Sequence, residues 1–141
     1  MESKRNLALY IDGENISAKK GQTIIDIIKK EGNMDYGKVY HRQKDNSTVE
    51  WFTFTKTRNE IKNIQLSEKP EKNKVDNKIK KDILKDINNA PNIDIIVIAS
   101  SDHDYIDIIE QVRKIGKRVI VIGEKKAPEK LRKAASKFIQ I

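Results

Sequence analysis

Two aspartates separated by one residue, Asp102 and Asp104, come two serines after a long apolar run in this chain. The run, residues 93–99, is interrupted only by Asp94 and is typical of a buried strand in a parallel sheet. Ligands of open α/β sheets bind at the carboxyl ends of the strands. Two carboxylates close together there repel each other unless a cation joins them, and Mg²⁺ and Mn²⁺ prefer oxygen ligands. A plainer role remains open, in which Asp102 caps the next helix and Asp104 lies in its first turn.

Carboxylates in two other segments favour the metal interpretation. Asp12 follows an apolar strand pattern at residues 7–11, and the glycine after it permits a tight turn. Apolar residues recur every four positions over residues 75–87, which predicts a helix. Asp76 falls within the apolar arc of that helix and Asp82 at its edge, where a carboxylate is costly without a partner. A helix-start role for Asp76, near the positive end of the helix dipole, is the alternative.

The surrounding pattern predicts that these segments converge. Strand patterns alternate with helical ones, although residues 47–54 favour a helix with a strand as the alternative. The predicted strands cover residues 7–11, 38–42, 61–66, 93–99, 118–122 and 138–141. Such alternation predicts a three-layer α/β/α, Rossmann-like fold with right-handed crossovers and a mostly parallel central sheet of about five to six strands. The carboxylates would then meet at one edge and hold one or two Mg²⁺ or Mn²⁺ ions, which activate water and stabilise charge on a phosphodiester.

Composition narrows the class of protein. The 141 residues suit a single domain, residues 1–141, and the chain stops inside the last predicted strand, as the front domain of a longer protein would. The net charge of +8 favours a polyanionic partner such as nucleic acid, the alternative being a lysine-covered surface that reflects an AT-rich genome. There is no cysteine, and the two histidines make a histidine metal site unexpected. Without an apolar run of membrane-spanning length or a signal peptide, a cytoplasmic protein is expected, with no membrane partner.

The chain resembles a known family in five segments. Three of them resemble the signature blocks of NYN domains, which are PIN-like nucleases: residues 10–15 (YIDGEN), residues 74–76 (KVD) with Asp82 six residues on, and residues 101–105 (SDHDY). Two more resemble the closing blocks of the bacterial LabA-like branch: residues 116–119 (GKRV) and 131–139 (LRKAASKFI). The resemblance covers nearly the whole chain, with the segments in the right order.

This resemblance implies a PIN-like fold and a metal-dependent endoribonuclease that uses Mg²⁺ or Mn²⁺. The implied catalytic and metal-binding residues are Asp12, Asp76, Asp102 and Asp104. The implied supporting residues are Asn15, Ser101 and Asp82. The family often has glycine at the positions of Ser101 and His103, and neither change removes an oxygen ligand. An exposed helix-start role is expected for His103, with contact to a phosphate or a carboxylate as the alternative.

Basic and aromatic residues suggest where RNA would bind. Lys69, Lys72, Lys74 and Lys78 form a basic run beside the acidic helix, and they suit either RNA steering or a solvated surface. Trp51 and Tyr105 are expected in the core rather than as base-stacking platforms.

Other functions remain open at this point. An RNA-binding or scaffolding module with a vestigial acidic site is the main alternative. A phosphatase or phosphotransferase also uses carboxylates at strand ends with Mg²⁺, but the turn after the first strand reads Asp12-Gly13-Glu14 and not Asp-x-Asp. No residue type reads a 2′-hydroxyl, so DNA is an alternative to RNA. Because isolated PIN-like domains often pair, the resemblance is also compatible with a homodimer.

Overall fold

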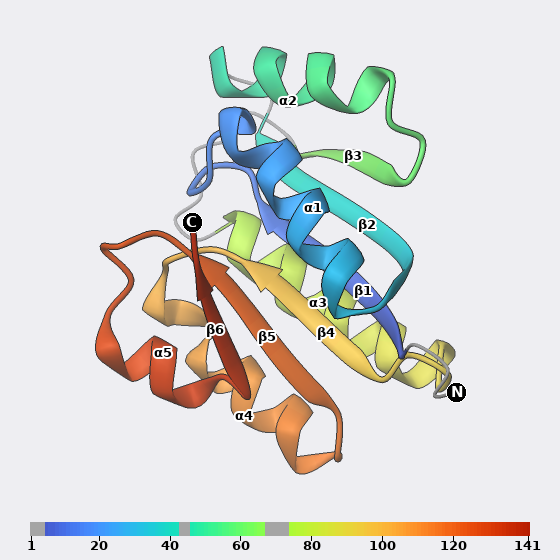
Figure 1. The fold of residues 1–141 in the computed structure, drawn as a ribbon, viewed down its shortest axis with the longest axis vertical. Coiled ribbons are helices and arrows are strands. Elements are labelled where there is room, and N and C mark those ends of the chain that lie inside the picture. Colours follow the sequence, from blue (N-terminus) through green and yellow to red (C-terminus); the bar gives the residue numbers. More distant parts are fainter. Residues whose placement is uncertain (1–4, 43–45, 67–73) are drawn as a thin grey trace.

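Strands and helices alternate along the chain, as the sequence predicts (Figure 1). The computed structural model describes residues 5–42, 46–66 and 74–141. The strands are β1 (Asn6–Asp12), β2 (Asn33–Arg42), β3 (Ile61–Leu66), β4 (Ile95–Ala99), β5 (Arg118–Gly123) and β6 (Lys137–Gln140). The helices are α1 (Gly21–Glu31), α2 (Asn46–Lys56), α3 (Lys74–Asn89), α4 (Ile106–Lys114) and α5 (Glu129–Ala134), with 3₁₀ turns η1 (Ala18–Lys20) and η2 (His103–Tyr105).

The strands form one sheet in the order β3-β2-β1-β4-β5-β6, and every pairing between neighbours is parallel. The expectation of a mostly parallel sheet of five to six strands is therefore confirmed. The chain moves outward from β1 through β2 to β3, then crosses back to β4 on the other side of β1 and continues outward again. The order thus reverses between β1 and β4, which is the position where open α/β sheets bind ligands.

Alternate residues of β1 feed two separate cores, as expected for a strand buried on both faces. Leu7, Leu9 and Ile11 pack in the cluster that contains buried residues of α1 and α2. Ala8 and Tyr10 pack in the cluster of α3, α4 and α5. The three layers of the α/β/α prediction are thereby observed, with two helices on one face of the sheet and three on the other (Figure 1).

The boundaries of two strands differ from the predictions by more than one residue. β2 begins at Asn33 instead of residue 38. Its first residues pair only with β1, and pairing with β3 starts at Gly37. In that half of the strand the partly buried Met34 and Tyr36 alternate with the exposed Asn33 and Asp35, a short pattern that the prediction did not use. β4 begins at Ile95 instead of residue 93: Ile93 is buried, which explains the apolar pattern, but it precedes the ladder.

The segment around Trp51 is helical, as favoured, and the indole is a core group. Trp51 is fully buried, and its Nε1 donates a hydrogen bond to the carbonyl of Ile16 at 3.0 Å.

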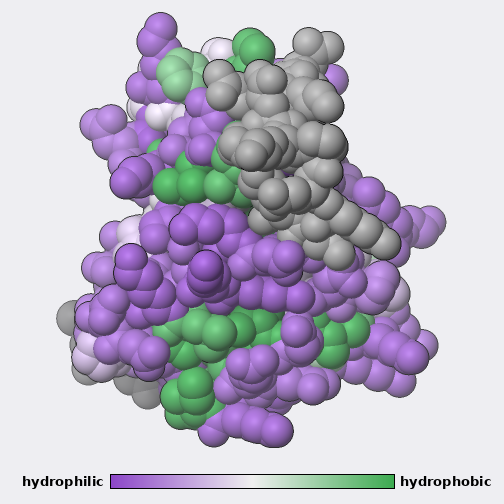
Figure 2. Space-filling model, turned by 180° about the vertical axis from the view of Figure 1, so that it is seen from behind, coloured by the Kyte–Doolittle hydropathy of each residue, from purple (hydrophilic) through white to green (hydrophobic). Residues whose placement is uncertain are grey.

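The face of the molecule seen from behind has a hydrophilic middle band with hydrophobic side chains above and below it (Figure 2). Among the described residues, no helix has the length and apolar character needed to cross a membrane.

Candidate functional site

An acidic pocket lies where the strand order reverses. β1 and β4 are parallel neighbours, and Ile11 is paired with Ala99, so the residues that follow them leave the sheet side by side. The pocket has a volume of about 200 Å³ and is lined by Asp12, Glu14, Asn15, Val75, Asp76 and Asp102. Three of the four aspartates expected at the site therefore face one cavity, although they lie far apart in the sequence.

Asp12, the last residue of β1, is held by donors on both carboxylate oxygens. Oδ2 accepts hydrogen bonds from the Tyr105 hydroxyl at 3.0 Å and from Ser100 Oγ at 3.4 Å, while Oδ1 accepts the backbone N–H of Glu14 at 3.2 Å. The side chain is buried, which raises the pKa of Asp12 to about 6 although the Tyr105 and Glu14 bonds act in the opposite direction. The charges of Glu14 and Asp102 also raise this pKa.

The turn after β1 depends on a glycine. The backbone N–H of Gly13 donates to the carbonyl of Tyr40 on β2 at 2.8 Å. A Cβ atom at position 13 would lie 2.7 Å from that same oxygen, closer than real Cβ atoms approach. Glycine therefore lets the chain turn tightly against β2 and present Asp12 at the strand end.

Side-chain hydrogen bonds join the turns that follow β1, β4 and β5. Asn15 Oδ1 accepts the backbone N–H of Ser101 at 2.8 Å, and Ser101 Oγ accepts the backbone N–H of Glu124 at 2.8 Å. Ser100 Oγ accepts the backbone N–H of Asp102 at 3.1 Å. Asn15 and Ser101 thus have scaffolding contacts at the pocket, which is compatible with the supporting roles expected for them.

Asp76 enters the pocket from the first turn of α3. The residue is only 5% exposed, and its Oδ1 is a buried oxygen without a hydrogen-bond partner in the described part of the protein. Burial raises the pKa of Asp76, and the charges of Asp104 and Asp102 raise it further against the opposing effect of Lys80. A buried carboxylate oxygen without a donor is costly, and a bound cation is one way to offset that cost.

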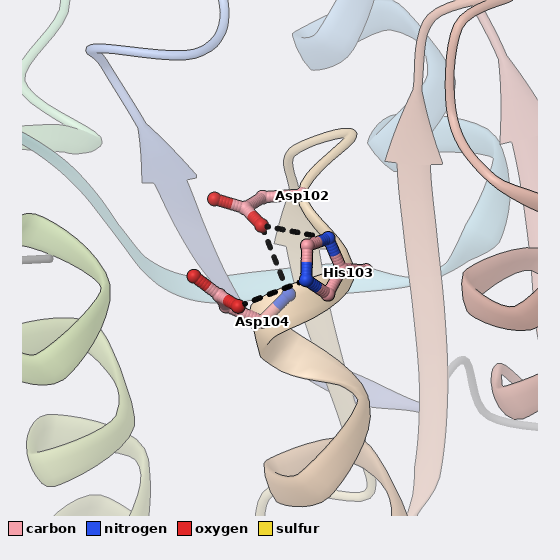
Figure 3. Close-up of side chains that lie close together, drawn as sticks. All are labelled: Asp102, His103 and Asp104. Carbon is pink, nitrogen blue, oxygen red and sulfur yellow. Dashed lines mark hydrogen bonds and ion pairs between the residues drawn. The ribbon is translucent and has the colours of Figure 1, made fainter.

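The turn after β4 brings Asp102, His103 and Asp104 together (Figure 3). Asp102 caps η2, because its Oδ1 accepts the backbone N–H of Asp104 at 2.9 Å, and Asp104 lies in the first turn. The plain capping role is therefore real, and it coexists with the place of Asp102 in the pocket. Asp104 is not among the residues that line the pocket, but it is close enough for its charge to raise the pKa of Asp76.

Asp82 does not reach the pocket and belongs to a second polar group, which we call the tyrosine–aspartate network. Asp82 Oδ2 accepts the Tyr40 hydroxyl at 2.6 Å, and Asp82 Oδ1 pairs with Lys78 Nζ at 3.0 Å. Burial raises the pKa of Asp82, but the hydrogen bonds from Tyr40 and Lys78 outweigh it and hold the pKa below its ordinary value. The network consists of Tyr10, Tyr36, Tyr40, Asp82 and Asp86 with the cations Lys38 and Lys78.

Little of the expected RNA-binding run can be placed. Lys69 and Lys72 lie outside the described residues, as does the side chain of Lys74 at the start of α3. Lys78 is 41% exposed and is engaged with Asp82. The contact of these lysines with RNA stays a prediction.

Sequence reasoning assigned no role at the site to Glu14, Ser100 or the Tyr105 hydroxyl. Glu14 lines the pocket, and its carboxylate pairs with Arg42 Nε at 2.7 Å. The sequence could have indicated this, because Glu14 lies two residues after Asp12 in the same turn. Tyr105 is fully buried, as expected, but its hydroxyl end contacts Asp12, which no periodicity could have indicated.

The donor set of the pocket fits a divalent metal ion. Its lining offers carboxylates and one amide, the oxygen donors that hard cations take, and one carboxylate oxygen there is buried without a partner. The parallel α/β sheet flanked by helices, with an acidic pocket where the strand order reverses, agrees with the PIN-like fold that the resemblance implies.

Comparison with known proteins identifies the family. The NYN domain matches residues 6–141, and the chain belongs to this family, whose members are generally nucleases. No curated protein matches the chain. A solved structure from Vibrio parahaemolyticus, of a protein of unknown function, is similar in fold, with a TM-score of 0.76 at 19% sequence identity. The similarity covers 100% of this chain and 96% of that one.

Proposed function

We propose that this protein is a metal-dependent endoribonuclease of the LabA-like branch, with Mg²⁺ or Mn²⁺ in the acidic pocket. One observation carries the proposal: the buried Oδ1 of Asp76 has no partner in the described part of the chain and belongs to a residue that lines the pocket with Asp12 and Asp102. Hydrogen bonding normally satisfies buried polar atoms, so a cation ligand there would complete the site.

Each residue has a definable task in this proposal. Asp12, Asp76 and Asp102 would hold the ion, and Asp104 would add negative charge beside them or a further ligand. Tyr105 and Ser100 orient Asp12 through the hydrogen bonds to its Oδ2. Asn15 keeps the turns after β1 and β4 in register. The ion, when bound, supplies a Lewis acid that activates water and stabilises charge on the phosphodiester.

The substrate is proposed from charge. An acidic pocket alone repels a polyanion, so binding of RNA needs positive charge elsewhere on the surface. The chain carries 29 lysines and arginines against 21 acidic residues, a net charge of +8. Such an excess attracts nucleic acid through counterion release. The run of Lys72, Lys74 and Lys78, beside the pocket residue Asp76 in sequence, is the proposed RNA contact.

The test is cleavage of a labelled single-stranded RNA with Mn²⁺, with Mg²⁺ and with EDTA, with a DNA of the same sequence alongside. Cleavage that requires metal and disappears in both Asp102→Asn and Asp12→Asn, while RNA affinity holds or rises, supports the proposal. Asp35→Asn is the matched control, because Asp35 is an exposed aspartate on the amino-terminal half of β2. RNA binding without cleavage in either metal would favour the scaffolding module instead.

A further inference from the structure

His103 contacts the carboxylates of its two neighbours, Asp102 and Asp104 (Figure 3), and Asp102 lines the acidic pocket. Its Nε2 is 3.3 Å from Asp104 Oδ1, and its Nδ1 is 3.7 Å from Asp102 Oδ1. One ligand atom from each of the three residues can be chosen so that all lie within 4.8 Å of one another. The side chain of His103 is 73% exposed, so packing does not hold the ring in this position.

The separation of His103 Nε2 from Asp104 Oδ1 suits two ligands of one ion. Both distances exceed the roughly 2.7–3.2 Å of an N–H···O hydrogen bond. Two ligand atoms that each lie about 2.1 Å from a metal ion, at right angles, are about 3 Å apart. The 3.3 Å between Nε2 of His103 and Asp104 Oδ1 is close to that separation.

A second observation, independent of this cluster, indicates that an ion belongs here. Asp102 is shared between the His103 cluster and the acidic pocket. In the same pocket, Asp76 is only 5% exposed, and its Oδ1 has no partner among the described residues. The pocket therefore contains a buried oxygen that a cation would satisfy, and His103 contacts Asp102, a carboxylate lining the same pocket.

We infer that the imidazole of His103 is a metal ligand, together with Asp102 and Asp104, and that it gives this centre a nitrogen donor. The inference rests on the proposed metal centre and specifies which ion it prefers. An all-oxygen site suits Mg²⁺, whereas an imidazole favours borderline transition metals such as Co²⁺ and Zn²⁺. The centre then selects a transition metal over Mg²⁺.

The experiment compares Mg²⁺ and Co²⁺ binding by calorimetry in the full chain and in His103→Ala and His103→Asn. Loss of the imidazole is expected to weaken Co²⁺ binding by about tenfold or more and to leave Mg²⁺ binding nearly unchanged. The visible absorption of bound Co²⁺ should also change, since it reports on nitrogen ligation. Asparagine keeps a polar side chain without an imidazole, so agreement of the two variants assigns the effect to the ring.

The chain carries its own reference for a spectroscopic test, because it has two histidines. His41 is fully buried, and its Nε2 contacts Asn63 Oδ1. Addition of Zn²⁺ should shift one imidazole ¹⁵N signal of His103 and leave those of His41 in place. An unshifted His103 would overturn the inference.

The outcomes separate this inference from the proposed function. Stronger binding of both ions by His103→Ala would show that the histidine competes with the metal as a cation, which overturns the inference but keeps the metal centre. Equal Co²⁺ binding by the wild type and both variants would also overturn the inference and keep the metal centre. A wild-type protein that binds neither ion would remove the metal centre itself.

Discussion

Helix α3 carries aspartates into two polar regions that differ in how their carboxylates are satisfied. In the acidic pocket, Asp76 leaves a buried oxygen without a partner in the described part of the chain. In the tyrosine–aspartate network, Asp82 and Asp86 each accept a tyrosine hydroxyl, at 2.6 and 2.7 Å, and each pair with a lysine. The two regions share one helix and the same chemical group, yet only the network is complete without a ligand.

The pKa values of the aspartates also differ between the two regions. Burial raises the pKa values of Asp12 and Asp76 in the pocket, where neighbouring carboxylates add to the effect. In the network, hydrogen bonds from Tyr40 and Lys78 hold the pKa of Asp82 below its ordinary value despite its burial. A satisfied carboxylate stabilises the fold, and an unsatisfied one costs stability that a bound cation could offset.

The largest difference is expected between Asp76→Asn and Asp86→Asn, which change one charge each on α3. Asp76→Asn should reduce divalent metal affinity and metal-dependent RNA cleavage on the order of 100-fold, because it removes a proposed ligand. Asp86→Asn should leave both unchanged and lower the free energy of unfolding by about 1 kcal/mol, because the Lys38 ion pair is lost while an acceptor remains. Calorimetric titration and urea denaturation measure the two effects.

Equal losses of metal binding in the two variants would contradict the division between the regions. They would show that the charge of α3 as a whole, and not the placement of Asp76, attracts the ion. Circular dichroism of both proteins serves as the control for folding.

The second difference concerns pH. Because the pKa of Asp12 is raised to about 6 from 3.8, the folded state favours its protonated form. Ionisation of Asp12 therefore costs stability; this cost is absent below about pH 4 and fully present above about pH 6. Asp12→Asn removes this dependence, so without metal its stability relative to wild type should rise by about 2 kcal/mol from pH 4.5 to pH 7.5.

Urea denaturation of both proteins in EDTA at the two pH values measures this change. A constant difference between them would mean that Asp12 titrates normally and that burial does not raise its pKa. Added Mg²⁺ or Mn²⁺ should stabilise the wild type and not the variant. This result would separate the stability cost of the ionised Asp12 carboxylate from its proposed role as a metal ligand.

The layers and the sheet were predictable because their signal is local. Continuous apolar runs marked β4 and β5, and the four-residue spacing of Val75, Ile79, Ile83 and Ile87 marked α3, all of them buried. The start of β2 was missed, because pairing with a single neighbour leaves its two apolar residues, Met34 and Tyr36, only partly buried and the pattern short. The strand order, with its reversal between β1 and β4, was not predicted, because right-handed crossovers are compatible with more than one order of strands.

The convergence of Asp12, Asp76 and Asp102 was also predictable, because strand ends and a buried helix face are visible in sequence. The sequence did not predict that Asp76 lies in the pocket and Asp82 in the tyrosine–aspartate network. Both lie on or near the apolar face of α3, and only tertiary contacts decide that Tyr40 and Lys78 satisfy Asp82.

The smallest effects are expected from removing one tyrosine hydroxyl in each region. Tyr40→Phe and Tyr105→Phe each keep a buried ring and delete a donor, to Asp82 and to Asp12 respectively. Each should lower the free energy of unfolding by about 1 kcal/mol, since the carboxylate keeps its other partners and no cavity forms. Only Tyr105→Phe should also weaken metal binding, because Tyr105 orients a pocket carboxylate and Tyr40 does not. If Tyr40→Phe weakened metal binding as much, the network would be part of the metal centre, and Asp82 would have the supporting role that the resemblance implies.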